Sequence, residues 1–217
     1  MVYQLTMPWT LLGKELAILK SLEDNYKSYF EKAAIQRPYS PRHVPERALL
    51  RKYAKLFWQL DEKTRDMIKE MFKGFLAVES FVDDYVYAGA RHAQNKLTIL
   101  ENTYRWGLEE RRHGQMFRYC LIDSGMLTQQ EVDEFLDQCA QDMWTFERQT
   151  GMAATASNTA SYTVVQERHT RHNYTKFRLF LMRLFEETGN QLLEILAKMV
   201  RYVEIDEGAH EGNFRAI

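Results

Sequence analysis

Apolar residues recur at helical spacing along most of the chain. Between residues 61 and 94 they recur every three or four positions, and this stripe consists of Met71, Phe75, Val78, Val82 and Val86. Asp61 has the side chain of an N-cap for this segment, and Glu79 lies at the edge of the stripe. No segment shows the alternation of apolar and polar residues that is typical of strands. The pattern predicts an all-α protein in which residues 61–94 form one long helix.

Capping and turn residues indicate where other helices begin and end. Thr98 with Glu101, and Thr128 with Glu131, each form the Thr-x-x-Glu pattern of a capping box. Gly189 separates the last two helices. The further expected helices are residues 11–35, 46–60, 98–122, 128–149, 162–187 and 190–213.

Two segments have the composition of connections. Pro38, Pro41 and Pro45 crowd into one stretch and predict a linker, while residues 151–161 are rich in Ala, Ser and Thr and predict a loop. We expect a single domain over residues 1–217. Residues 1–45 would form an N-terminal helix and proline-rich linker, and residues 46–217 would form the bundle core.

Composition narrows the class of protein. The chain has 217 residues and a net charge of −1, which lacks the bulk basicity usual for nucleic-acid binding. No apolar stretch is long enough to span a bilayer, and no secretory signal is present. Cys120 and Cys139 have no metal-binding spacing, and we interpret them as two reduced, buried thiols. We therefore expect a cytoplasmic protein with no membrane span and no nucleic-acid partner.

Two Glu-x-x-His steps stand within helical sequence. They are Glu110 to His113 and Glu207 to His210, and each places a carboxylate and an imidazole on one helix face. Two other expected helices carry Glu79 and Glu167 in otherwise apolar stretches, and these six residues are the candidate metal ligands. Two such steps plus one Glu from each of two further helices form the ligand set of di-iron carboxylate four-helix bundles.

A simpler interpretation of these residues remains open at this point. The glutamates could lie at the solvated edges of amphipathic helices, although carboxylates within apolar faces are costly unless they are paired or bind a metal. The other histidines are interpreted as residues that bind no metal. They are His43 and His92, expected on the surface, and His169 and His172, whose spacing from Glu167 does not favour its face.

Four segments of the sequence resemble the soluble acyl-carrier-protein desaturases. Residues 105–125 match their Trp followed by Glu-Glu-x-Arg-His-Gly, and residues 162–170 match Tyr-Thr-x-x-Gln-Glu-Arg-x-Thr. Residues 205–214 match Asp-Glu-x-x-His-Glu, and residues 78–85 match more weakly. The resemblance extends from about residue 73 to the C-terminus and implies a compact family member, shortened at its C-terminus, with a ferritin-like four-helix bundle and additional N-terminal and connecting helices.

The resemblance also implies roles for individual residues. Glu110 and Glu207 would bridge two irons, with a mixed manganese–iron site as the alternative. Glu79 and His113 would complete one iron site, while Glu167 and His210 would complete the other. Beside them the resemblance places Asp206 as an acceptor that orients a ligand histidine, Trp106 next to the first Glu-x-x-His step, and Thr170 on the oxygen side.

The function that the resemblance implies is O2-dependent desaturation of an acyl chain carried by an acyl carrier protein or another acyl thioester. A reduced ferredoxin-type protein would supply electrons, and the chain would form a homodimer. Three alternatives stay open. They are a di-iron hydroxylase or N-oxygenase, a ferritin-like protein that oxidises or stores iron, and a metal-free helical interaction protein.

A carrier protein is usually acidic, so we expect its docking surface to be basic. The first candidate group is Arg91, Lys96, Arg111, Arg112 and Arg118, and the second is Arg37, Arg42, Arg47, Arg51 and Lys52. Solvated helix faces would explain both groups as well, because acidic residues are interspersed among them.

Overall fold

The computed structural model describes residues 9–26, 39–91, 97–141 and 145–215. Regular structure within these ranges is helical throughout, with no strand, so the predicted all-α class is confirmed. No helix among the described residues combines the length and the apolar character that a membrane span requires. The prediction of a single domain stays a prediction.

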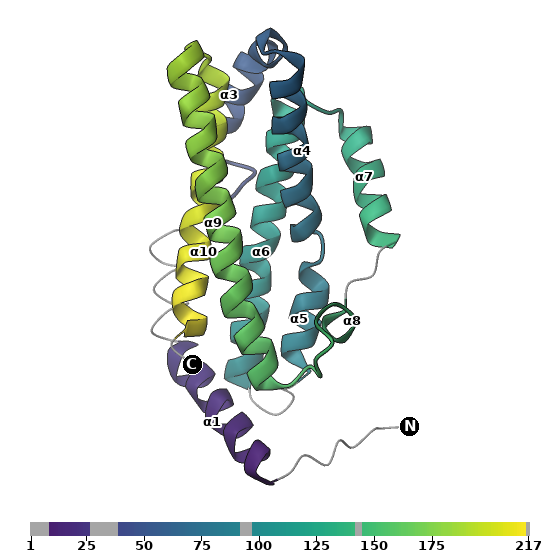
Figure 1. Ribbon diagram of the computed structural model, residues 1–217, viewed down its shortest axis with the longest axis vertical. Helices are drawn as coiled ribbons and strands as arrows, with labels where there is room; N and C mark the ends of the chain where they lie inside the picture. Colours follow the sequence, from purple (N-terminus) through teal and green to yellow (C-terminus); the bar gives the residue numbers. More distant parts are fainter. Residues whose placement is uncertain (1–8, 27–38, 92–96, 142–144, 216–217) are drawn as a thin grey trace.

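Long helices run side by side along the molecule, as Figure 1 shows. α6, α9, α10 and the successive pair α4 and α5 form the bundle, α7 lies outside it, and α1 packs against α6, α9 and α10 at one end. The elements are α1 (Trp9–Tyr26), α3 (Glu46–Tyr53), the 3-10 helix η2 (Ala54–Gln59), α4 (Glu62–Glu79), α5 (Val82–Ala90), α6 (Leu97–Asp123), α7 (Gln129–Gln141), α8 (Phe146–Thr150), α9 (Ala156–Thr188) and α10 (Gln191–Arg215).

Several helix ends follow the predicted local chemistry. The Asp61 side chain caps α4 by accepting a hydrogen bond from the Thr64 backbone N–H at 3.0 Å. Thr128 and Glu131 bond reciprocally at the start of α7, so this capping box is confirmed. Gly189 ends α9 with a φ of 68°, a conformation that glycine adopts without steric cost.

The expected helix over residues 61–94 is broken, which corrects the prediction. α4 ends at Glu79 and α5 begins at Val82, and the Ser80 hydroxyl donates to the Ala77 carbonyl at 2.6 Å. Such a side-chain bond competes with the helical hydrogen-bonding pattern. The buried stripe also differs from the prediction, since Met71 and Val78 are exposed and Glu79 lies within the buried face.

Other boundaries differ as well. The expected loop at 151–161 is shorter, because α9 begins at Ala156 with Thr155 as its N-cap. The expected helix 128–149 is two helices, α7 and α8. α6 already includes Leu97, so Thr98 lies inside the helix and does not precede it. The expected helix 11–35 is described as α1 from Trp9 to Tyr26, and its remainder lies outside the described residues.

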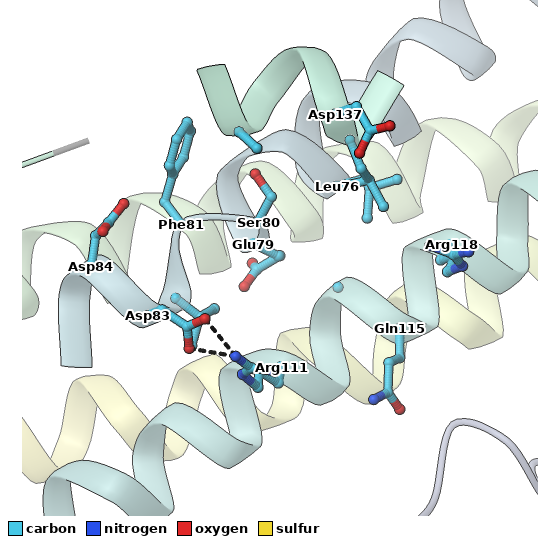
Figure 2. Close-up of a pocket in the computed structure, with 14 residues that line it drawn as sticks. Leu76, Glu79, Ser80, Phe81, Asp83, Asp84, Arg111, Gln115, Arg118 and Asp137 are labelled. Carbon is cyan, nitrogen blue, oxygen red and sulfur yellow. Dashed lines mark hydrogen bonds and ion pairs between the residues drawn. The ribbon is translucent and has the colours of Figure 1, made fainter. Parts of the chain in front are cut away.

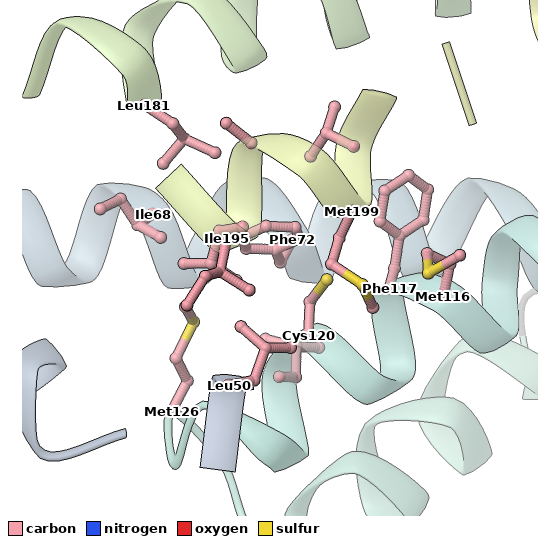
Figure 3. Packing of buried hydrophobic residues seen from close by; sticks show 14 of the residues in the cluster. Leu50, Ile68, Phe72, Met116, Phe117, Cys120, Met126, Leu181, Ile195 and Met199 are labelled. Carbon is pink, nitrogen blue, oxygen red and sulfur yellow. The ribbon is translucent and has the colours of Figure 1, made fainter. Parts of the chain in front are cut away.

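The main hydrophobic core packs buried side chains from several helices against one another, and Figure 3 shows part of it. Most of its members come from α3, α4, α6, α9 and α10, with Phe57 from η2, Val132 from α7 and Met126 from the connection between α6 and α7. Figure 3 labels Leu50, Ile68, Phe72, Met116, Phe117, Cys120, Met126, Leu181, Ile195 and Met199. Buried carboxylates lie next to this core on all four helices. Glu79 follows Phe75 on α4 and Glu207 follows Val203 on α10, while Glu110 on α6 and Glu167 on α9 precede the core residues of their helices. The core therefore holds four helices in register where the polar residues meet.

Candidate metal centre

Four helices of the bundle converge on a buried cluster of carboxylates and histidines. α4 and α9 each contribute one glutamate, while α6 and α10 each contribute one Glu-x-x-His step. The residues brought together are Glu79, Glu110, His113, Glu167, Glu207 and His210, all of them buried. All six candidate ligands found in the sequence thus meet in one place, and the solvated-edge interpretation is wrong for them.

The cluster consists of two overlapping groups of four residues. Within each group, one potential ligand atom per residue lies within 4.8 Å of the others. Glu110 and Glu207 belong to both groups. The remaining members are Glu79 and His113 in the first group and Glu167 and His210 in the second. Two sites that share two carboxylates are the arrangement expected of a two-metal centre.

Two of the carboxylates are each held through one oxygen by a neighbouring donor. The Tyr174 hydroxyl donates to Glu79 Oε1 at 2.5 Å, and Trp106 Nε1 donates to Glu167 Oε1 at 2.9 Å. Both donors are buried, and Trp106 is further fixed by edge-on contact with Phe214. These bonds fix the orientation of the carboxylate planes.

Thr170 contacts one of the shared carboxylates. Its Oγ1 lies 3.0 Å from Glu207 Oε2 and 3.0 Å from the carbonyl oxygen of Gln166 in the same helix. The hydroxyl carries one proton, so it can donate either to Glu207 or to its own helix. The structure thus places Thr170 at the cluster, and its catalytic role stays a prediction.

Three carboxylate oxygens in the cluster have no hydrogen-bond partner among the described residues. They are Glu110 Oε1, Glu167 Oε2 and Glu207 Oε1. Each lies near a histidine Nδ1 without hydrogen-bond geometry, for example Glu207 Oε1 at 3.1 Å from His113 Nδ1. Buried acceptors without donors are costly, and a cation bound between them would satisfy all three. The residues present therefore fit a metal centre.

Both histidines present Nδ1 to the cluster and use Nε2 outside it. Nε2 of His113 lies 3.4 Å from Asp206 Oδ2, and Nε2 of His210 lies 3.0 Å from Glu109 Oε2. Each acidic residue directly precedes the shared glutamate of one helix and contacts the histidine of the other helix. An acceptor at the outer nitrogen fixes the tautomer that leaves Nδ1 able to bind a metal.

Asp206 and Glu109, the outer carboxylates that contact Nε2 of the two histidines, make further contacts. The Tyr39 hydroxyl donates to Asp206 Oδ2 at 2.8 Å, and the Arg112 guanidinium lies 3.2 Å from Glu109 Oε1 and over the Tyr39 ring. Tyr39 precedes α3, so the segment before the bundle reaches the outer edge of the site.

Burial and mutual charge shift the ionisation of the cluster. Burial, reinforced by Glu110, raises the pKa of Glu79 and of Glu167 well above the ordinary value. Burial opposes a positive imidazole at His113, but Glu110 and other carboxylates raise its pKa above the usual range, and the pKa of His210 is raised for the same reason. Without a cation, the cluster therefore retains protons near neutral pH.

Removing either outer acceptor should weaken metal binding while leaving the fold intact. We expect Asp206→Asn and Glu109→Gln each to lower metal affinity by about 10–100-fold, because the facing histidine loses the acceptor that orients it. Titration of metal into the apoprotein measures this, with Glu101→Gln, an exposed change on α6, as the control. Affinities equal to that of the control would remove the orienting role.

A pocket of about 570 Å³ reaches the cluster from the surface. It lies between α6, α7 and the break that separates α4 from α5 (Figure 2), and its lining includes Glu79 and Gly114. A Cβ on Gly114 would lie 3.3 Å from the Glu79 Cβ, so glycine permits the close approach of α6 to this carboxylate. Figure 2 also shows Arg111 paired with Asp83 at the mouth.

The remaining sequence-based interpretations have mixed outcomes. His43, His169 and His172 are exposed and contribute to neither group, as expected, while His92 lies outside the described residues. Cys120 is buried, whereas Cys139 is only half-buried, which corrects that prediction.

The predicted docking arginines are largely compensated by acids. In the first group, Arg91 pairs with Glu147, Arg111 with Asp83, Arg112 with Glu109 and Arg118 with Asp133. In the second, Arg47 and Arg51 both pair with Asp123. Lys96 and Arg37 lie outside the described residues. A docking role for either group stays a prediction.

Three contacts at the site were not predicted from the sequence. Glu109 could have been found, because it precedes its Glu-x-x-His step just as Asp206 precedes the other. Tyr174 follows Glu167 by two helical turns, which places it on the same face but does not indicate its contact with Glu79. Tyr39 carries no local signal for a contact 167 positions away.

Comparison with known proteins gives one match. A family model described as "Fatty acid desaturase" matches residues 86–217, which include α6, α9 and α10 with both Glu-x-x-His steps and Glu167. No curated protein and no solved structure matches the chain.

Proposed function

Since this chain belongs to the fatty acid desaturase family, we propose that it is a di-iron, O2-dependent oxidoreductase that introduces a double bond into an acyl chain. The observation that carries the proposal is the pair of overlapping groups that share Glu110 and Glu207. Carboxylate and imidazole donors suit iron or manganese, and neither cysteine belongs to the cluster. The proposed framework is a ferritin-like bundle with the metals between its helices.

The reaction determines what must be supplied from outside. Removal of two hydrogen atoms from a CH2–CH2 unit yields two electrons and two protons, whereas reduction of O2 to two waters consumes four of each. Two electrons and two protons must therefore come from an external donor and from solvent. A di-iron centre supplies the reduction of O2 and the oxidising strength needed to remove hydrogen from an unactivated CH2 group.

The residues around the centre have separate tasks in this proposal. Trp106 and Tyr174 hold Glu167 and Glu79, so that the oxygens facing the metals keep their positions. Thr170 holds Glu207 and can deliver a proton at Oγ1 during turnover. The packed aromatic rings of Phe75, Phe117 and Tyr174 exclude water from one side of the cluster.

The acyl substrate would enter through the pocket beside Glu79. This pocket has a candidate metal ligand in its wall, and Leu76 and Val82 provide apolar surface next to it. Its outer part carries Asp83, Asp84 and Arg111, which suits a polar head group that stays in water. We propose a thioester of an acyl carrier protein, or another acyl thioester, as the substrate.

The proposal is tested by single turnover. The iron-loaded protein is reduced with dithionite, mixed with O2 and a panel of acyl carrier and acyl coenzyme A thioesters, and the products are identified by mass spectrometry. We expect a product lighter by two hydrogens from at least one substrate. Hydroxylated or N-oxidised products instead would favour another di-iron oxygenase, and accumulation of ferric mineral with no organic product would favour an iron-storage protein.

Substitution of Thr170 tests whether consumption of O2 is coupled to oxidation of the substrate. We expect Thr170→Val to retain its metals but to form roughly tenfold less product per O2 consumed, with more hydrogen peroxide, since the hydroxyl at Glu207 is lost. Thr170→Ser keeps the hydroxyl and should stay close to the wild type. Product and peroxide are measured together. Equal amounts of product per O2 consumed in the Val and Ser variants would exclude a role of the Thr170 hydroxyl in substrate oxidation.

A further inference from the structure

Basic residues gather on one stretch of α9 although the chain as a whole has a net charge of −1. Between Glu167 and Glu186, α9 contains five Arg or Lys residues, two His and no acid. The basic residues are Arg168, Arg171, Lys176, Arg178 and Arg183. Because like charges repel, such a run has a cost for the isolated helix, and it marks a face that suits an anionic partner.

A groove of about 850 Å³ lies along this stretch, between α9 and α10. Arg168, His169, Arg171 and His172 line it from α9, and Arg215 lines it from α10. All five side chains are exposed. We call the groove together with Lys176, Arg178 and Arg201 the α9–α10 basic face.

The acids on this face do not neutralise it. Glu211 is shared by Arg171 at 3.0 Å and Arg215 at 3.4 Å, and Glu204 is shared by Arg178 at 2.6 Å and Arg201 at 2.8 Å. Each glutamate thus pairs with two arginines, so each group of one glutamate and two arginines keeps a net charge of +1. Arg168 and Lys176 make no ion pair with any residue that the structure describes. The face therefore carries an excess of four positive charges with the histidines neutral.

The groove lies against the backbone that carries part of the metal centre. The Arg171 side chain crosses α10 at Gly208, where a Cβ would lie 3.5 Å from Nε and 3.6 Å from Cζ. Gly208 directly follows Glu207, and Glu167 directly precedes Arg168. The face is thus the outer surface of the two helices whose inner surfaces carry Glu167, Glu207 and His210.

On the basis of the desaturase function proposed above, we propose that the α9–α10 basic face docks the electron donor, an acidic iron–sulfur protein that gives one electron at a time. None of the six candidate metal ligands lines this groove, so an acyl chain placed in it would not contact the centre. Transfer of an electron, unlike oxidation of an acyl chain, does not require the donor to contact the candidate metal ligands. The pocket beside Glu79 does contain a candidate ligand and remains for the substrate.

The test uses the full-length iron-loaded protein and a plant-type [2Fe–2S] ferredoxin as the acidic probe. Arg168→Glu/Lys176→Glu is compared with Lys55→Glu/Lys63→Glu, which makes the same charge change at exposed lysines of η2 and α4. Affinity is measured by calorimetry at low salt and at about 0.15 M salt, where exposed charges more than about 8 Å apart are screened.

We expect the wild type to bind the ferredoxin more weakly as salt rises. The α9 variant should bind at least about tenfold more weakly than the wild type at low salt, and the control should change much less. The inference would be overturned if both variants lost affinity for the ferredoxin equally, if the α9 variant lost none, or if the wild type did not bind the ferredoxin.

Activity distinguishes this inference from the proposed function. With substrate present, ferredoxin-dependent turnover should fall in the α9 variant in step with affinity, while its iron content stays that of the wild type. Dithionite-reduced single turnover needs no docking partner. If the wild type forms no product even then, the proposed function fails, whereas the affinity comparison still decides the docking surface.

Discussion

Glu110→Ala should lose both metals, whereas His113→Ala should lose only one. Glu110 belongs to both groups of potential ligands, and His113 belongs to the first group alone. Relative to about two metals in the wild type, we expect about one in His113→Ala and His210→Ala and close to none in Glu110→Ala. Single-turnover product should be abolished in all three, because a lone metal cannot complete the centre.

Elemental analysis of iron-reconstituted proteins measures this pattern, with circular dichroism to check that each variant remains helical. His169→Ala, an exposed histidine on α9 outside both groups, serves as the control and should keep the wild-type content. Equal metal content in Glu110→Ala and His113→Ala would contradict the sharing of Glu110 between two sites.

Metal should stabilise the protein strongly, and more so as the pH rises. In the metal-free protein the pKa values of Glu79, Glu167, His113 and His210 are raised, so in the pH range above the ordinary pKa values of these groups, about 4.3 for Glu and 6.5 for His, the folded state binds more protons than the unfolded state. Its free energy of unfolding should therefore fall as the pH rises through this window. Metal replaces those protons, so metal affinity should rise with pH instead.

The expected size of the stabilisation by metal follows from mass action. At a free metal concentration about a thousandfold above Kd, binding contributes about 4 kcal/mol, which raises Tm by roughly 10 °C in a domain of this size. Calorimetric scans of metal-loaded and chelator-treated protein from about pH 6.5 to 9 measure the difference. A Tm difference that is absent, or that shrinks as the pH rises, would argue against metal binding through these four groups.

Local sequence signals predicted the parts of the fold that depend on neighbouring residues. Asp61, the Thr128–Glu131 capping box and Gly189 act within a few positions, and all three have their expected roles. The break after Glu79 was missed because no Gly or Pro stands there, and the sequence alone does not show that the Ser80 hydroxyl bonds to the Ala77 carbonyl.

The start of α9 depends on a distant part of the chain. Residues 151–161 have the composition of a loop, yet α9 begins at Ala156. Glu15 of α1 accepts a hydrogen bond from the Ser157 backbone N–H at 2.8 Å, so a residue 142 positions away satisfies a free donor at this helix end. Local composition cannot show such a contact.

The candidate site likewise combines features that local sequence spacing predicts with contacts between distant residues that it does not predict. The spacing of Glu110 and His113, and of Glu207 and His210, follows from helix geometry, so the sequence could show that each pair shares a face. Their convergence could be inferred from the combination of helices and from the family resemblance. The contacts of Tyr39 and Tyr174 depend on how helices and the preceding segment pack, which no local spacing encodes.

The central claim is a two-metal centre in which Glu110 and Glu207 are shared. Anomalous diffraction from crystals of the iron-loaded protein, recorded on both sides of the iron absorption edge, tests it most directly. We expect two iron peaks per chain, with Glu79 and His113 at one, Glu167 and His210 at the other, and Glu110 and Glu207 between them. A single peak, or iron bound away from these six residues, would contradict the account.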